Sequence, residues 1–233
     1  NCINRYTIGA ATQGLANYLK KSFPGQPVRV AIAFDSRNNS QSLARTTAET
    51  FAANGIKVFL FRELRPTPLL SFAIRHLQCQ SGVVVTASHN PKEYNGYKAY
   101  WTDGAQLVPP HDKNVMEEVN AITGFDQIKF NGNPRNIEWV GPEVEAAYYE
   151  ALEKTIPFRE AVQRQGDIPI VFSGLHGTGN TMVPECLRRL GFGNCLVVER
   201  QAMPDGNFPT VASPNPEEKE AMALALALAH QQK

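Results

Sequence analysis

Short apolar runs alternate with helical patterns along the first half of the chain. Runs rich in β-branched residues at 28–34, 56–61 and 81–87 predict three buried strands. Around them, apolar residues recur at helical spacing over 8–19, 44–52 and 68–77. Strands that alternate with helices of this length indicate βαβ units, which build a mostly parallel sheet covered on both faces.

Three local signals mark helix ends. Asn4 is a candidate N-cap for the first helix, and Gly55 can end the second helix in the left-handed conformation. Pro68 lies in the first turn of the third helix, where its missing N–H costs little.

The segment 97–102 departs from the parallel pattern. It follows the strand at 81–87 after a short loop that contains Asn95 and Gly96. A short loop cannot make the helical crossover that a parallel neighbour needs, so we expect this strand to run antiparallel. The predicted fold is a three-layer αβα domain with a mixed, mostly parallel sheet.

The second half of the chain predicts an incomplete α/β unit. A loose polar segment at 124–142 precedes a long amphipathic helix at 142–156. The second unit then starts near Asp167 and has predicted strands at 168–172 and 195–199. Its final helix, at 217–232, has Asn215 and Pro216 as its candidate cap and first-turn residues. Two strands leave an unpaired edge, so we expect this unit to be truncated. The expected boundaries are 1–154 and 155–233.

Composition and charge narrow the classes of function. The 23 Lys and Arg residues balance 22 Asp and Glu residues, which gives no electrostatic reason for a nucleic-acid or membrane partner. The apolar run at 221–229 is too short to span a bilayer, and no signal peptide opens the chain. The four cysteines form no C-x-x-C pair, which favours reduced thiols in a cytoplasmic protein.

A candidate nucleophile lies in the run Thr-Ala-Ser-His-Asn-Pro at 86–91. This run follows the third predicted strand, at the edge where parallel sheets bind ligands. A turn-forming Asn90 and a φ-locked Pro91 stiffen the loop, so it could present Ser88 as a nucleophile or a phosphate carrier. The alternative is an ordinary β-turn.

Two cationic residues are expected at the same edge of the sheet. Lys98 lies on the returning strand, where it could neutralise a phosphate or simply face solvent. Arg37 ends the first strand and suits a phosphate or carboxylate, although the same segment could only start a helix with Asn39 or Ser40 as its cap.

Other patterns are weaker. Gly177 and Gly179 follow a predicted strand, and Glu199 ends the next strand, as in a dinucleotide site. Met182 replaces the third glycine of that motif, so the signal is weak. The five histidines show no ligand spacing, and no zinc site is expected.

The motifs together resemble one enzyme family. The serine loop at 86–91 is followed by Asn-Gly-Tyr-Lys-Ala-Tyr and Asp-Gly-Ala-Gln, and Asp-Ser-Arg at 35–37 precedes it. Matching motifs continue at 175–179, 204–209 and 213–217. The chain resembles the α-D-phosphohexomutase superfamily of phosphoglucomutases and phosphomannomutases, as an N-terminal fragment that covers domain 1 and part of domain 2. This resemblance favours a functional role for Ser88 over a plain turn.

The resemblance implies an isomerase of carbohydrate metabolism that moves a phosphoryl group between O1 and O6 of a hexose phosphate. Ser88 would be the catalytic serine, carried as phosphoserine, and the reaction would pass through a bisphosphate intermediate. His89 and Lys98 would be catalytic residues that neutralise phosphate or handle protons. Arg37 and Asn90 would order the loop.

The resemblance also implies cofactors and gaps. Mg²⁺ would bind through the phosphate on Ser88, and glucose or another hexose 1,6-bisphosphate would be the activator. The family's other metal ligands and its sugar-reading residues have no match here, so we expect the isolated chain to be inactive. A non-catalytic phosphosugar-binding module and a nucleotide-binding α/β domain remain alternatives. Sugar preference, oligomeric state and the phosphorylation of Ser88 stay open.

Overall fold

A computed structural model describes residues 3–232, which form two compact units. The first unit contains the chain up to Asp35 together with Asn39–Ala87 and Asn95–Gly141. The second contains Ser36–Asn38, Ser88–Tyr94 and the chain from Pro142 onward. Two short segments in the first half of the chain therefore belong to the second unit.

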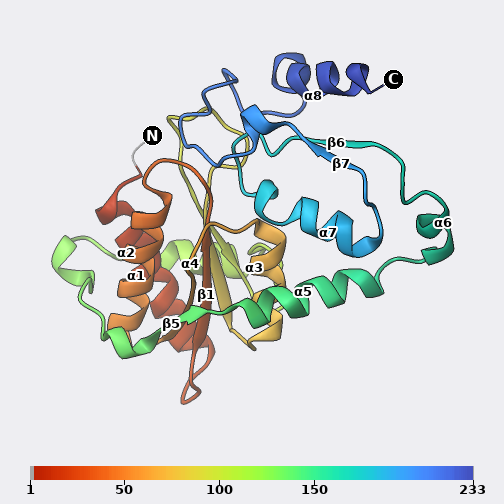
Figure 1. Ribbon diagram of the computed structural model, residues 1–233. Coiled ribbons are helices and arrows are strands. Elements are labelled where there is room, and N and C mark those ends of the chain that lie inside the picture. Colours follow the sequence, from red (N-terminus) through yellow and green to blue (C-terminus); the bar gives the residue numbers. More distant parts are fainter. Residues whose placement is uncertain (1–2, 233) are drawn as a thin grey trace. The chain divides into compact units, whose positions relative to one another are not determined.

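The first unit is built on a five-stranded mixed sheet (Figure 1). Its strands are β1 (Arg29–Phe34), β2 (Lys57–Phe61), β3 (Ser81–Val85), β4 (Tyr97–Tyr100) and β5 (Ile137–Val140), in the spatial order β4-β3-β1-β2-β5. All neighbouring pairs are parallel except β3 and β4, which are antiparallel. The mixed, mostly parallel sheet and the antiparallel return strand are confirmed.

Helices cover both faces of this sheet (Figure 1). They are α1 (Arg5–Ser22), α2 (Ser40–Ala53), α3 (Thr67–His76) and α4 (His111–Asn120). Alternate β1 residues, among them Val30 and Ile32, join a buried cluster with side chains from α1, α2 and α4. On the other face α3 approaches β3 closely, because a Cβ added at Gly82 would lie 2.4 Å from Ile74 Cδ1. Glycine at this position allows that close packing.

The three predicted helix-end signals are confirmed, and Pro68 lies in the first turn of α3. The Asn4 side chain accepts hydrogen bonds from the backbone N–H groups of Tyr6 and Thr7, at 2.8 and 3.1 Å. Gly55 has a left-handed φ of 77° after α2. Asn39 occupies the N-cap position of α2, but its φ is 68° and its side chain makes no capping hydrogen bond.

The segment expected to be loose and polar contains the edge strand β5. Its residues pair in parallel with β2, with Phe59 opposite Glu138 and Leu60 opposite Trp139. Only Val140 of this strand is buried, and Trp139 is 42% exposed. An edge strand that buries so little carries no clear apolar pattern, and for this reason the prediction of a loose segment was wrong here.

The second unit contains a two-stranded parallel sheet of β6 (Ile170–Phe172) and β7 (Cys195–Val197). Its helices are α5 (Pro142–Lys154), α6 (Arg159–Arg164), α7 (Val183–Leu190) and α8 (Lys219–Gln231). The final helix starts at Lys219 with Glu218 as N-cap, later than expected, because Asn215 accepts a hydrogen bond from the Glu217 N–H ahead of the helix.

The division between the units differs from the expected boundary. The sequence predicts the boundary after residue 154, whereas the second compact unit already includes the chain from Pro142 and therefore contains α5. None of the helices within residues 3–232 is both long and apolar enough to cross a membrane.

Candidate functional site

The segment Ser88–Tyr94 connects β3 to β4 and presents the candidate nucleophile. Ser88, His89 and Asn90 are all exposed. Ser88 has a φ of 57°, a left-handed conformation that costs a serine about 1–2 kcal/mol. Its Oγ lies 3.4 Å from Nδ1 of His89, a long contact for a hydrogen bond. The surrounding structure must hold the strained residue in place.

Arg37 holds this loop from inside. Its Nη1 donates to the carbonyl oxygens of Pro91 and Tyr94, at 2.9 and 3.0 Å. Its Nη2 donates to the carbonyl oxygens of Ser88 and Asn90, at 2.9 and 2.6 Å. The residue is only 3% exposed. A planar guanidinium suits this task, because its fork of donors reaches several acceptors at fixed angles.

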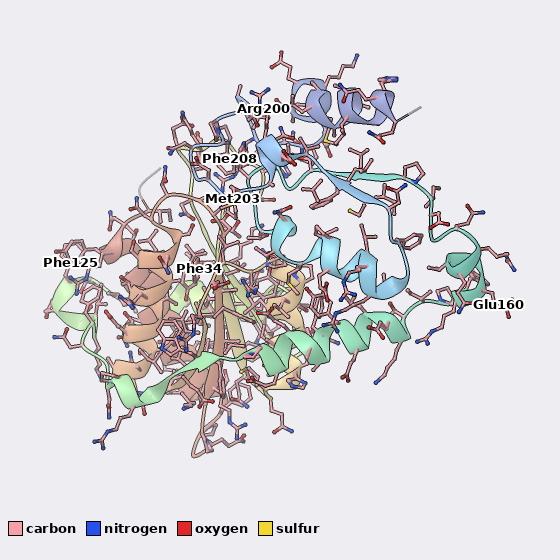
Figure 2. The ribbon with its side chains drawn as sticks, in the orientation of Figure 1. Phe34, Phe125, Glu160, Arg200, Met203 and Phe208 are labelled. Atoms are coloured by element: carbon pink, nitrogen blue, oxygen red, sulfur yellow. The ribbon has the colours of Figure 1, made fainter. Side chains whose placement is uncertain are left out.

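A segment far along the chain packs on Arg37 within the same unit. The Phe208 ring centroid lies 5.3 Å from the Arg37 guanidinium carbon, a cation–π contact. Phe208 is labelled in Figure 2. Asn38 donates through its side-chain amide to Asn207 Oδ1 at 3.1 Å. Gly206 also lies close, because a Cβ there would be 2.5 Å from the Asn38 backbone nitrogen. Residues 206–208 therefore support Arg37 and its neighbours.

A second network, within the first unit, fixes the two chain ends that flank the loop. Both carboxylate oxygens of Asp35 accept hydrogen bonds, Oδ1 from Ser40 at 2.7 Å and Oδ2 from Thr86 at 2.6 Å. Asn95 donates to the Ser40 hydroxyl at 2.8 Å. The Thr86 N–H donates to the Gly96 carbonyl at 3.1 Å. The last residues after β3 and the first before β4 are thus tied together.

The structure brings together four of the five predicted site residues. Arg37, Ser88, His89 and Asn90 lie in one unit, and Arg37 bonds directly to the backbone of Ser88 and Asn90. Lys98 is half-buried on β4 of the other unit, in register with Val84. Its role beside the serine stays a prediction.

Tyr97 precedes Lys98 in the chain, and its hydroxyl is not a candidate for proton transfer. Burial raises the pKa of its hydroxyl above the ordinary value of 10.0, and the nearby Thr12 side chain offsets only part of this. A phenol with a raised pKa stays protonated near neutral pH, so it cannot act as a general base there.

The glycine motif after β6 does not form an open phosphate cradle. The Gly177 N–H already donates to the Gly174 carbonyl at 2.7 Å, and a Cβ at Gly179 would lie 3.3 Å from the Phe172 ring. Both ring nitrogens of His176 are also in use, with Nδ1 donating to the Met203 carbonyl and Nε2 bonded to the Thr210 hydroxyl. The hydrogen bonds of this segment serve the fold of the second unit.

Sequence reasoning missed the roles of Phe208 and Asp35. Phe208 lies in the run Pro-Asp-Gly-Asn-Phe-Pro, which the resemblance singled out as a motif but without a function. Its contact with Arg37 spans most of the chain, and no local pattern predicts such a contact. The Asp35 network could have been suspected, since Asp35 and Thr86 end adjacent parallel strands.

The fold and the site define a class: α/β proteins that present a serine from a clamped loop that follows an interior strand of the sheet. Sequence comparison narrows it further. Residues 1–125 match alpha/beta/alpha domain I of phosphoglucomutase/phosphomannomutase, and residues 146–233 match domain II. The chain belongs to the phosphoglucomutase/phosphomannomutase family.

Individual relatives agree with this assignment. The chain is 38% identical to a phosphoglucomutase of Staphylococcus haemolyticus over 98% of its length, and 35% identical to a human phosphopentomutase over 93%. It spans only 41% and 37% of those two proteins. A crystal structure from Thermus thermophilus, named as a putative phosphomannomutase, superimposes with a TM-score of 0.81 at 25% identity, over 97% of this chain and 48% of that one.

Proposed function

We propose that the chain forms part of a phosphosugar mutase in which Ser88 carries the phosphoryl group. The observation that supports this most is the Arg37 clamp, which holds an exposed serine in a strained conformation through four carbonyl oxygens of its own loop. A clamp of this kind keeps a reacting oxygen in a fixed position. Phosphoryl-transfer enzymes obtain most of their rate enhancement from such positioning and from charge stabilisation.

The proposed cycle has two transfers. First, the bond between phosphorus and Ser88 Oγ breaks and a bond from phosphorus to a free sugar hydroxyl forms, while the proton of that hydroxyl passes through a nearby base to Ser88 Oγ. The product is a hexose 1,6-bisphosphate, which turns over in the site. The bond between the other phosphorus and its sugar oxygen then breaks as a bond from that phosphorus to Ser88 Oγ forms, and the base passes the serine proton to the sugar oxygen. This transfer restores the phosphoserine and leaves the isomeric monophosphate.

The neighbouring residues have distinct proposed tasks. His89, whose ring nitrogen lies 3.4 Å from Ser88 Oγ, would accept or return the proton. Lys98 would neutralise the charge of the phosphate. Arg37 acts through the loop as a positioning residue, because its guanidinium donates to backbone oxygens. Asn90 supplies one of those oxygens.

Mg²⁺ would neutralise charge on the transferring group when bound to a phosphoserine oxygen. Within residues 3–232, no group of three His, Cys, Asp or Glu side chains could hold a metal ion. Apart from the phosphate that we propose on Ser88, the described residues do not form a metal site, and we assign no step to the ion. A hexose 1,6-bisphosphate would act as activator by restoring the phosphate to Ser88.

We further propose that the 233-residue chain alone does not turn over substrate. Its described residues supply the carrier serine but no metal site, and the chain spans about two fifths of the relatives it matches. Interconversion by the isolated chain at about 1–1000 s⁻¹, the range of ordinary enzymes, would contradict this part without touching the carrier role. Cys79, Cys186 and Cys195 are free thiols, in keeping with the reducing cytoplasm we propose as its location.

Phosphorus NMR of the whole protein tests the reaction. Glucose 1-phosphate, mannose 1-phosphate and ribose 1-phosphate are offered separately with a trace of the matching bisphosphate, and the sugar that is converted identifies the substrate. We expect Ser88→Ala to lower the rate by about 10³-fold or more, and Ser22→Ala on α1 to leave it unchanged. A Ser88→Ala protein that keeps its activity would refute the proposal. Binding of sugar phosphates without any conversion would favour the phosphosugar-binding alternative.

A further inference from the structure

A groove in the first unit carries charges that the mutase reaction does not use. It consists of two adjoining pockets of about 420 and 370 Å³, which lie between α2 and the strands β2 and β5. The pockets share four lining residues, Arg45, Glu49, Leu60 and Trp139, so they form one continuous groove. Each pocket alone falls in the size range of small-molecule sites.

The wall of the groove is strongly cationic. Arg5 from α1, Arg45 from α2 and Arg62 after β2 all line it and are all exposed. Glu49 is the one acidic residue in its lining, so the formal charge of the lining is about +2. The whole chain has a net charge of only +1, which makes this concentration of charge local.

These arginines form no ion pairs within the part of the chain that the structure describes. The side chain of Arg45 forms no hydrogen bond or salt bridge within residues 3–232. Arg5 lies over the Phe130 ring at 4.7 Å and Arg62 over the Trp139 ring at 5.5 Å. Ring contacts orient a guanidinium but leave its N–H groups able to donate to an anion.

The groove also has an apolar side. Phe34 and Leu60 are almost fully buried beneath it, and Trp139 remains 42% exposed at its edge (Figure 2, where Phe34 is labelled). An indole that is partly open to solvent beside guanidinium groups offers a flat surface for an aromatic ring. The groove therefore combines sites for phosphate groups with a site for a planar base.

We propose that this groove binds a nucleoside polyphosphate, with its phosphates on Arg5, Arg45 and Arg62 and its base against Trp139. Guanidinium groups bind phosphate through paired hydrogen bonds, and several of them favour a ligand with more than one phosphate. The groove is too small and too local for a nucleic-acid strand, and the even charge of the chain argues the same way. The inference does not depend on the role of Ser88.

Calorimetric titration in the absence of divalent cations tests this site. The probes are ADP, inorganic tripolyphosphate and adenosine, each titrated into the unmodified protein. We expect ADP to bind more tightly than adenosine and tripolyphosphate, and the affinity for ADP to fall as salt is raised. Arg45→Ala should weaken ADP binding by about 10- to 100-fold, the loss expected for charge-assisted hydrogen bonds.

Two further variants separate the contributions. Trp139→Leu should weaken the binding of ADP more than that of tripolyphosphate, because it removes the surface for the base as well as the ring contact of Arg62. Arg75→Ala, which removes an exposed arginine from α3 of the same unit, should change neither. Arg45 and Arg75 are both exposed, so replacing either of them by alanine should not prevent folding. No binding at millimolar ADP, or binding that Arg45→Ala leaves intact, would overturn the proposal, and equal affinity for ADP and tripolyphosphate would overturn the base contact.

Discussion

Replacing Arg37 by lysine tests whether one guanidinium holds the Ser88–Tyr94 loop. Arginine donates four hydrogen bonds here, two from each terminal nitrogen. Lysine has a single nitrogen with three donors and cannot match the geometry of the fork, so at least two of these bonds should be lost. Hydrogen bonds to charged groups contribute about 1.5–3 kcal/mol each. The lower value gives a loss of about 3 kcal/mol, or roughly 100-fold easier opening of the loop.

Hydrogen-exchange mass spectrometry measures that opening directly. In peptides that cover residues 88–94, the Tyr94 amide, which donates to the Pro91 carbonyl at 3.0 Å, should exchange about 100-fold faster in Arg37→Lys, whereas peptides from β1 and β3 should be unchanged. Arg164→Lys, on exposed α6 of the same unit, is the matched control and should leave the loop as it is. If the loop exchanges at the same rate in Arg37→Lys as in the unmodified protein, the clamp does not order the loop and the reasoning fails.

Three further substitutions test the surroundings of the loop and the core. Phe208→Leu should speed exchange in the loop less than Arg37→Lys does, because a cation–π contact contributes about 0.5–2 kcal/mol, and an equal or larger effect would contradict this ranking. Asp35→Asn should lower the free energy of unfolding by about 1–3 kcal/mol in urea titration, because an amide can accept only one of the two hydroxyl bonds, and an unchanged value would exclude that network as a source of stability. Burial raises the pKa of the Cys79 thiol from 9.0 to about 12, so the folded state favours the protonated thiol. The stability that the buried thiol contributes is therefore present below pH 9 and is lost as the pH rises toward 12. The melting temperature of Cys79→Ala should therefore fall less steeply than that of the unmodified protein above pH 9, and parallel curves would argue against this linkage.

The sheet could be predicted from the sequence wherever strands are buried on both faces. β1 and β3 consist of nearly continuous apolar residues, and the short Asn95-Gly96 loop was enough to predict the antiparallel direction of β4. The edge strand β5 could not be predicted, because its pairing with β2 decides its conformation and only one of its four residues is buried. Where the neighbour determines the structure, a local pattern carries little information.

The candidate site divides in the same way. Arg37 and Ser88 follow adjacent parallel strands, so their proximity could be predicted from the order of the elements. That Arg37 would bind backbone carbonyls, while its ring partner Phe208 comes from far along the chain, depends on long-range packing. The glycine motif at Gly177 suggested a phosphate cradle, but its N–H is satisfied by its own turn.

The most direct test of the central claim is the intact mass of the purified protein, combined with peptide mapping. We predict a species heavier by about 80 Da after incubation with a hexose 1,6-bisphosphate, with the added group on Ser88, removable by phosphatase and absent from Ser88→Ala. A phosphate that maps only to another residue, or a mass that does not change under these conditions, would contradict the claim that Ser88 carries the phosphoryl group.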